Sequence, residues 1–280
     1  MYLAMGFTHI EGGPIAHRVK YDDDTFVVGL PGGKVVPALS DDAYDYVSQY
    51  LTAWYRFLQE NNWLDRTVQH IADEPLEKNK REYRILAGIV RKFMPGIPTF
   101  EAIETTDLDG AIDIWIPKPP YYVKNTEAFD RKRKNGDRVW FYTCTDPGGT
   151  YVNRFLDGAL IRTRLIHTAN YRYHFEGYLH WGFNCYHAGN GDPFNTANLI
   201  HPAGDSHIVY PGSEGPWGSV RLEMMRCGIE DYELLTLLAQ KNKPLADKIA
   251  ENWLPAFNKP NEDVDAFAAG REELLQALDR

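Results

Sequence analysis

Short apolar runs alternate with longer helical patterns along most of this chain, and this alternation constrains the fold more than any other feature. Such alternation is typical of β/α units that build a parallel sheet. The apolar runs predict strands at residues 2–10, 67–72, 98–104, 111–116, 138–144 and 177–184. We therefore expect an α/β fold.

Apolar residues at helical spacing fill the segments between these runs. They predict helices at residues 41–61, 75–94, 121–135 and 156–175, and further helices at 219–238, 245–257 and 263–278. Ser40 and Ser219 are expected to cap their helices, and Pro75 is expected in a first helical turn. Residues 187–210 and 213–218 are rich in Gly, Pro and Asn and predict long loops.

The number of strand-helix units limits the architecture. Six units are two fewer than a (β/α)8 TIM barrel contains, and residues 11–39 predict a small hairpin around Pro31 instead of two parallel strands. We predict an incomplete TIM-barrel-like domain over residues 1–240, with its first two strands missing, and a C-terminal helical extension at residues 241–280 packed on it. A missing N-terminal segment or a partner chain is expected to cover the open edge.

Charge and composition exclude several classes of partner. A net charge of -9 and a pI near 5.5 argue against nucleic acid or an anionic membrane surface. No apolar stretch approaches the roughly 18 residues of a membrane span, and no signal peptide is recognisable, so the compartment stays unknown. Neither the three cysteines nor the histidines have the spacing of a metal motif, so we predict no metal and no cofactor.

Two adjacent acidic residues, Asp73 and Glu74, stand where the predicted strand at 67–72 runs into Pro75. Active sites of β/α enzymes lie at such strand exits. Adjacent carboxylates cannot easily flank a glycosidic bond from opposite sides, so the pair predicts a proton donor, Glu74, beside an orienting charge, Asp73. A 2-acetamido group of the substrate would then act as nucleophile. Alternatively, Asp-Glu-Pro merely opens a helix.

Residues near the other predicted strand ends are expected to form the walls of a sugar site. Aromatic rings stack on sugar faces, although core packing is the alternative for each ring. The candidates for substrate binding are His9, Trp115, Trp140, Tyr142 and Trp181.

Longer motifs carry a family resemblance. Ile71-Ala-Asp-Glu-Pro75, Gly177-Tyr-Leu-His-Trp-Gly-Phe-Asn184, Asp192-Pro-Phe-Asn195, Tyr210-Pro-Gly212 and the helix from Ser219 to Glu233 resemble the catalytic domain of glycoside hydrolase family 123. The resemblance covers about residues 1 to 240. Cys227 departs from it, because the family usually has an acidic residue there, and the family's N-terminal β-sandwich is absent from this chain.

The resemblance implies an exo-β-N-acetylgalactosaminidase that retains configuration through an oxazolinium intermediate. Asp73 would orient the substrate amide and Glu74 would be the acid/base. The motifs also place Asp192, Tyr210 and Arg221 near the cleft. The implied partner is a carbohydrate with a terminal β-linked N-acetylhexosamine, and N-acetylglucosamine is the nearest competitor.

Two other functions stay open. One is an ordinary retaining glycosidase, with Glu74 as acid and Asp146 or Glu104 as nucleophile. The other is an inactive sugar-binding or structural remnant of such a barrel.

Overall fold

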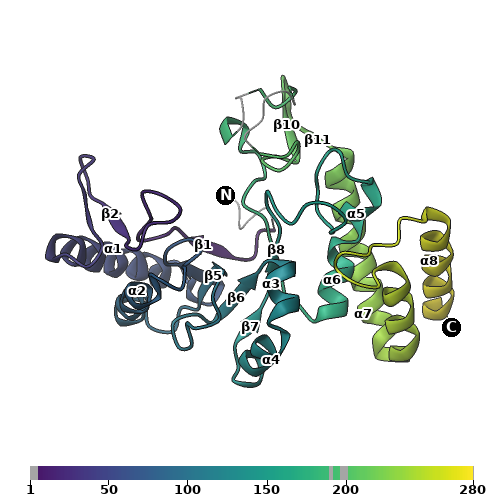
Figure 1. Cartoon of the computed structure of the whole chain (residues 1–280), viewed down its shortest axis with the longest axis horizontal. Helices are drawn as coiled ribbons and strands as arrows, with labels where there is room; N and C mark the ends of the chain where they lie inside the picture. Colours follow the sequence, from purple (N-terminus) through teal and green to yellow (C-terminus); the bar gives the residue numbers. More distant parts are fainter. Residues whose placement is uncertain (1–5, 189–191, 196–200, 280) are drawn as a thin grey trace. The chain divides into compact units, whose positions relative to one another are not determined.

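The computed structural model describes residues 6–188, 192–195 and 201–279, which fall into two compact units. The first unit ends at Val139 and the second begins at Trp140. Both contain helices and parallel strand pairs, so the predicted α/β class is confirmed (Figure 1). None of the described helices is long and apolar enough to cross a membrane.

A five-stranded parallel sheet forms the centre of the first unit, in the order β1-β4-β5-β6-β7. Its strands are β1 (Ile10–Gly12), β4 (Thr67–His70), β5 (Thr99–Ile103), β6 (Ile114–Pro117) and β7 (Arg138–Val139). Every residue of β5 and β6 is buried, as expected for central parallel strands that are covered on both faces. The described strands do not close into a barrel, so the barrel prediction is confirmed only as a parallel α/β arrangement.

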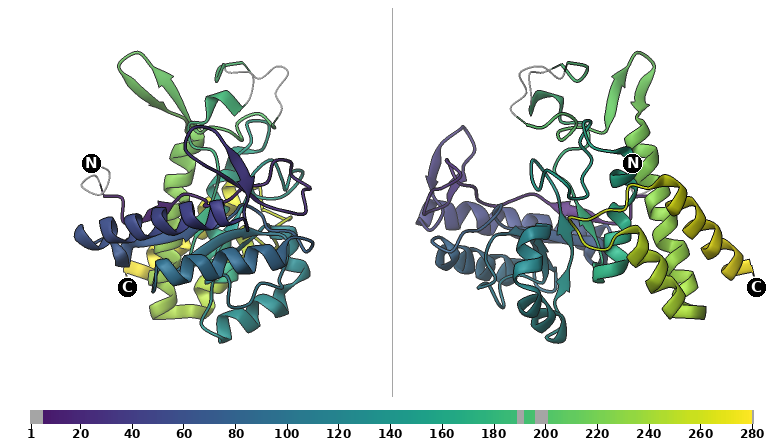
Figure 2. Two further views of the ribbon diagram at one scale, coloured as in Figure 1. Left: turned by 90° about the vertical axis from the view of Figure 1, so that its left-hand side faces the viewer. Right: turned by 45° about the vertical axis from the view of Figure 1, so that its right-hand side comes forward.

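Helices and a hairpin complete the first unit. They are α1 (Asp41–Glu60), η2 (Leu64–Arg66, a 3-10 helix), α2 (Lys80–Phe93), α3 (Pro119–Lys124), α4 (Thr126–Lys134), and the antiparallel strands β2 (Val27–Gly29) and β3 (Val35–Pro37). Helices α1 and α2 pack side by side (Figures 1 and 2). The Ser40 cap is confirmed, because its hydroxyl accepts a hydrogen bond from the Ala43 N–H at 3.3 Å.

Two predicted boundaries in the first unit are wrong. The strand predicted at 2–10 begins only at Ile10, where pairing with Thr67 of β4 starts; residues 1–5 lie outside the described residues. The helix predicted from Pro75 begins at Lys80. The preceding residues form a turn in which the Leu76 N–H donates to the side chain of Asn79 at 2.8 Å.

The second unit combines two small sheets with a helical layer. A parallel pair is formed by β8 (Phe141–Tyr142) and β9 (Tyr178–Leu179), and an antiparallel pair by β10 (Val209–Gly212) and β11 (Gly215–Gly218). The helices are α5 (Leu160–Arg164), α6 (Ile166–Tyr173), η3 (Tyr186–Ala188), α7 (Val220–Trp253) and α8 (Val264–Asp279). Helix α7 packs against α5, α6 and α8 (Figure 1).

Some predicted elements of the second unit differ from those observed. Residues 213–218, predicted as a loop, belong to the β10–β11 hairpin, in which Tyr210 lies opposite Trp217. The helices predicted at 219–238 and 245–257 merge into α7, which has a non-helical break at Asn242 before Pro244. Within the predicted loop at 187–210, residues 189–191 and 196–200 lie outside the described part. The predicted domain boundary after residue 240 falls inside α7 and stays a prediction.

Candidate active site

The chain leaves the sheet between β4 and α2 through a turn that carries Asp73 and Glu74. Glu74 has a φ of 47°, in the left-handed region that residues other than glycine rarely adopt. Such a conformation costs on the order of 1 kcal/mol and persists only where surrounding contacts fix it. The turn frees the two adjacent side chains from the alternation of a strand, which would point them to opposite faces.

Two neighbouring strands deliver further charged side chains to the carboxyl edge of the sheet. Glu104 follows β5, and Lys118 follows β6. The ammonium of Lys118 lies 3.4 Å from a Glu74 carboxylate oxygen and 3.2 Å from a Glu104 carboxylate oxygen. The side chains of Lys118 and Glu74 are only 14% and 13% exposed, so water screens their interaction less than that of a surface pair. Lys118 therefore links the Asp73–Glu74 turn to Glu104, at the exit of β5.

The segment between β1 and β2 contributes Arg18 and Tyr21 to this cluster. Arg18 donates a hydrogen bond to the backbone carbonyl of Asp73 at 3.1 Å, and its guanidinium lies 4.7 Å from the centre of the Tyr21 ring. Partial burial, followed by the charges of Glu74 and Glu104, raises the pKa of Tyr21, whose hydroxyl is hydrogen-bonded to Glu104. Tyr21 thus remains a neutral donor beside the carboxylates.

Asp73 has an unusual environment for a residue at the surface. It is exposed, yet many protein atoms surround its carboxylate. This desolvation, followed by the charge of Glu74, raises the pKa of Asp73, and the positive charges of His70, Arg18 and Lys118 oppose the rise.

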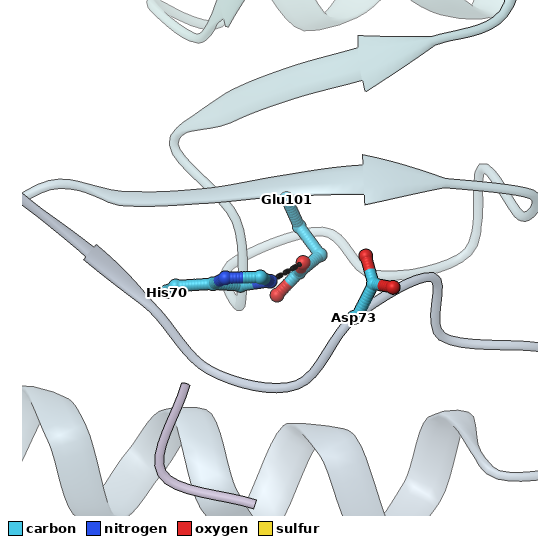
Figure 3. Close-up of side chains that lie close together, drawn as sticks. All are labelled: His70, Asp73 and Glu101. Atoms are coloured by element: carbon cyan, nitrogen blue, oxygen red, sulfur yellow. Dashed lines mark ion pairs between the residues drawn. The ribbon is translucent and has the colours of Figure 1, made fainter. Parts of the chain in front are cut away.

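Beside the turn, the Glu101 side chain lies between His70 and Asp73 (Figure 3). His70 Nε2 is 2.5 Å from Glu101 Oε1. Burial alone would lower the pKa of His70, but the charge of Glu101 outweighs it and raises the pKa to about 9. Burial raises the pKa of Glu101, and His70 opposes that rise.

The same three residues form a group, within the described part of the chain, whose ligand atoms lie within 4.8 Å of one another. A divalent metal would need a neutral imidazole. Because His70 Nε2 instead lies against the Glu101 carboxylate at 2.5 Å, we interpret the group as an ion pair.

Residues 14–238 match the family model described as the catalytic domain of glycoside hydrolase 123. The chain belongs to glycoside hydrolase family 123. The predicted family is thereby confirmed. No curated protein matches the chain.

A solved family 123 glycoside hydrolase from Clostridium perfringens, described in terms of glycolipid glycan hydrolysis, has a similar structure, with a TM-score of 0.69 and 18% sequence identity. The match covers 97% of this chain and 50% of the solved one, so this chain spans half the length of that relative. At this identity the likeness shows a shared fold.

Two residues predicted for sugar contact in this family 123 domain lie elsewhere. His9 precedes β1 and is therefore at the amino edge of the parallel sheet, whereas Asp73 follows the carboxyl end of β4. Trp115 lies inside β6 and is fully buried, and its indole N–H donates to Asp137 at 3.0 Å. Trp115 therefore packs in the core and His9 lies at the edge of the sheet opposite the turn, and a sugar contact by either residue stays a prediction.

The other predicted aromatic residues belong to the second unit. Tyr142 is only 3% exposed, so its ring packs inside this unit, and a sugar contact stays a prediction. Trp140 is half-buried against Gly177, where a Cβ would lie 2.4 Å from the indole. Trp181 is 40% exposed, and its indole N–H donates to the buried Asp205 at 3.0 Å. Trp181 is therefore held in place with much of its ring open to solvent.

The polar residues predicted from the family motifs also lie in the second unit. Asp192 is exposed and accepts a hydrogen bond from the Phe194 N–H at 2.9 Å. Tyr210 is half-buried, and its ring stacks with Phe194 at 5.4 Å. Arg221 is only 2% exposed and donates hydrogen bonds to two backbone carbonyls at 2.8 Å, which joins the loops that carry them.

Four residues around the turn were not predicted from the sequence. Glu101 had a detectable signal, because it is the single acidic residue inside an otherwise uncharged strand, Thr99–Ile103. Lys118 also had one, because it follows directly on a buried apolar strand. Arg18 and Tyr21 had none, because they lie in an irregular segment without periodicity.

Proposed function

We propose that this family 123 domain removes a terminal β-linked N-acetylhexosamine, with N-acetylgalactosamine as the preferred sugar. The observation that carries the proposal is the turn after β4, which places two adjacent carboxylates at one strand exit and Glu74 3.4 Å from the Lys118 ammonium. A non-reducing terminal sugar of a glycan fits the description of the solved relative, which concerns glycolipid glycans.

The proposed reaction has two steps and retains the anomeric configuration. In the first, the carbonyl oxygen of the substrate acetamido group attacks the anomeric carbon, and Glu74 donates its proton to the leaving glycosidic oxygen. The amide N–H faces Asp73, whose charge stabilises the positive oxazolinium. In the second step, Glu74 removes a proton from water, the water oxygen bonds to the anomeric carbon, and the oxazolinium ring opens to regenerate the acetamide.

Hydrolysis of paired aryl β-N-acetylgalactosaminide and β-N-acetylglucosaminide substrates tests this proposal. The Glu74→Gln variant is expected to lose about 10²–10⁴-fold in kcat/KM on substrates with poor leaving groups. It should lose far less on a dinitrophenyl glycoside, whose departure needs no proton. Glu77→Gln, an exposed acid three residues away, is the matched control and should keep its activity. Equal losses on both leaving groups would contradict acid catalysis by Glu74.

The Asp73→Asn variant tests the substrate-assisted step. We expect kcat to fall by about 10²-fold or more, because the oxazolinium loses its stabilising charge. A thiazoline mimic of the oxazoline should inhibit the wild-type protein and bind the variant more weakly. Full activity of the variant would rule out this mechanism.

A second candidate mechanism is favoured by the contact of Lys118 with both Glu74 and Glu104. In that case Glu104 is the nucleophile of an ordinary retaining glycosidase. This mechanism predicts that Glu104→Gln abolishes turnover, that the acetamido group is dispensable, and that the thiazoline does not inhibit. A sugar-binding domain without activity instead predicts saccharide binding that Glu74→Gln leaves unchanged.

A further inference from the structure

Glu101 is fully buried in the middle of β5, and a buried carboxylate is costly unless its oxygens are hydrogen-bonded or paired. One oxygen accepts hydrogen bonds from the backbone N–H groups of Ile71 at 3.4 Å and Ala72 at 3.2 Å, and from the hydroxyl of Tyr83 at 3.0 Å. The other oxygen is the one paired with His70. The carboxylate therefore satisfies the backbone of the two residues that lead into the catalytic pair.

The same two residues lie just beyond the end of β4, so they lack partners from the strand ladder. The carbonyl of Ile71 accepts hydrogen bonds from the N–H groups of Ile15 at 3.0 Å and Ala16 at 3.2 Å. Ile71 is thus held on one side by the β1–β2 segment and on the other by the Glu101 side chain. The Glu101 carboxylate thus accepts the two backbone hydrogen bonds that a longer strand ladder would have satisfied, at the point where the chain turns toward Asp73.

His70 supplies the charge that this arrangement needs. Its ring faces Glu101 from β5 at 2.5 Å and Glu11 from β1 at 3.7 Å, and Asp73 lies on the far side of Glu101 (Figure 3). Without the positive charge of His70, the carboxylates of Glu11 and Glu101 would lie close to the Asp73–Glu74 pair with less charge to balance them. Coulomb repulsion would then favour a protonated Asp73, which could not stabilise an oxazolinium.

We propose that Glu101 and His70 are positioning residues for the catalytic turn. Glu101 fixes the backbone ahead of Asp73, and the His70 cation balances the Glu101 charge so that Asp73 stays ionised. This inference rests on the proposed function for its catalytic consequence, although the ion pair and the anchored backbone are testable without any substrate.

The first test uses the wild-type protein and needs no activity. An NMR titration with labelled histidine is expected to show His70 titrating near pH 9, because Glu101 holds its proton. In the Glu11→Gln variant, whose altered side chain is 58% exposed and therefore should not disturb folding, the pKa of His70 should fall. The amide protons of Ile71 and Ala72 should exchange slowly. A His70 that titrates near its ordinary value, or fast exchange of both amides, would overturn the proposal.

The second test uses the pH profile of hydrolysis. In the His70→Gln variant, the acidic limb of kcat/KM, which reports the Asp73–Glu74 pair, is expected to move to higher pH by about 0.5–1 unit. The control is His167→Gln, which alters a half-buried histidine of the second unit that contacts Asn170. It should leave the limb in place.

The outcomes separate this inference from the proposed function. A wild-type protein without turnover contradicts the function, and the NMR titration then decides on the ion pair alone. Turnover with an unmoved limb in His70→Gln, even if kcat falls, contradicts the positioning role while the function stands.

Discussion

At the residue scale, Glu74 combines the side chain of the proposed acid/base with a backbone conformation that suits glycine. Its φ of 47° lies where a Cβ is crowded by the neighbouring carbonyl oxygen. The side chain is retained there although the backbone disfavours it. We interpret this conflict as a sign of function, because strained residues gather at active sites.

Glycine and alanine at position 74 should reverse their usual order of stability. We expect Glu74→Gly to be more stable than Glu74→Ala by about 1 kcal/mol, because only alanine retains the strained Cβ. Both variants lose the same contact with Lys118, so their difference isolates the backbone. Urea unfolding measures it.

Glu233, exposed on α7, provides the matched comparison. Here Glu233→Gly should be less stable than Glu233→Ala by about 1 kcal/mol, the ordinary penalty of glycine in a helix. If the glycine variant were the less stable of the two at both positions, strain at Glu74 would be contradicted.

The sequence is informative about residues that belong to a pattern. Asp73 and Glu74 follow an apolar strand, and their place at its exit could be predicted. The place of Trp115 could not be predicted, because β6 is buried on both faces, where alternation cannot distinguish a core ring from an exposed one. Tyr21 could not be predicted, because only the folded loop brings it to Glu104.

At the scale of elements, the caps should account for a measurable part of the stability. Ser40→Ala is expected to cost about 1 kcal/mol, because the first turn of α1 loses its side-chain acceptor. Ser48→Ala, inside the same helix, should be neutral or slightly stabilising, because alanine is the better helix former. Thermal unfolding of both variants provides the comparison, and equal losses would contradict the cap.

Close packing of α5 on α7 depends on Gly228. A Cβ there would lie 2.2 Å from the backbone oxygen of Arg164, so Gly228→Ala is expected to destabilise by about 2 kcal/mol or more. Gly88→Ala in α2 meets no atom within 4 Å and should stabilise by up to about 1 kcal/mol. Chemical unfolding of the two variants should therefore give opposite signs.

Element boundaries could be predicted where they depend on local chemistry, as at Ser40 and Ser219. The predicted boundaries were wrong where strand pairing determines them. The apolar run at 2–10 resembles a strand, but β1 starts at Ile10 because its partner β4 starts at Thr67. The β10–β11 hairpin lacks an apolar pattern, since all four residues of β11 are exposed.

At the scale of the whole molecule, two histidines with largely buried side chains should set the pH range of stability. The charge of Glu101 outweighs burial and raises the pKa of His70 to about 9, whereas burial lowers the pKa of His180 to about 4. Unfolded histidine titrates near about 6.5. Protonated His70 therefore stabilises the fold fully below about 6.5, and this stability is lost as pH rises through about 9. Neutral His180 contributes above about 6.5, and its contribution is lost as pH falls toward about 4.

We therefore expect the free energy of unfolding to be greatest near neutral pH and to fall on either side, by at most about 3 kcal/mol per histidine. Hydrogen exchange resolved along the chain measures where the loss begins. Alkaline pH should first loosen the unit that ends at Val139, and acid pH the unit that begins at Trp140. The His70→Gln variant should lose the decrease in the free energy of unfolding at alkaline pH and keep the decrease at acid pH. If alkaline pH first loosened the unit that begins at Trp140, these pKa values would be contradicted.

The hydrogen bonds of Ile71 also bear on the order in which the first unit folds. Strands β4, β5 and β6 follow one another closely, whereas β1 joins β4 across the whole hairpin and α1. Short loops close at lower entropic cost, so β1 should dock last. Ile15, Ala16 and Arg18 arrive with it. During refolding, hydrolysis should therefore recover later than secondary structure. Before β1 docks, the chain contains both carboxylates, but the turn that orients them is not yet fixed.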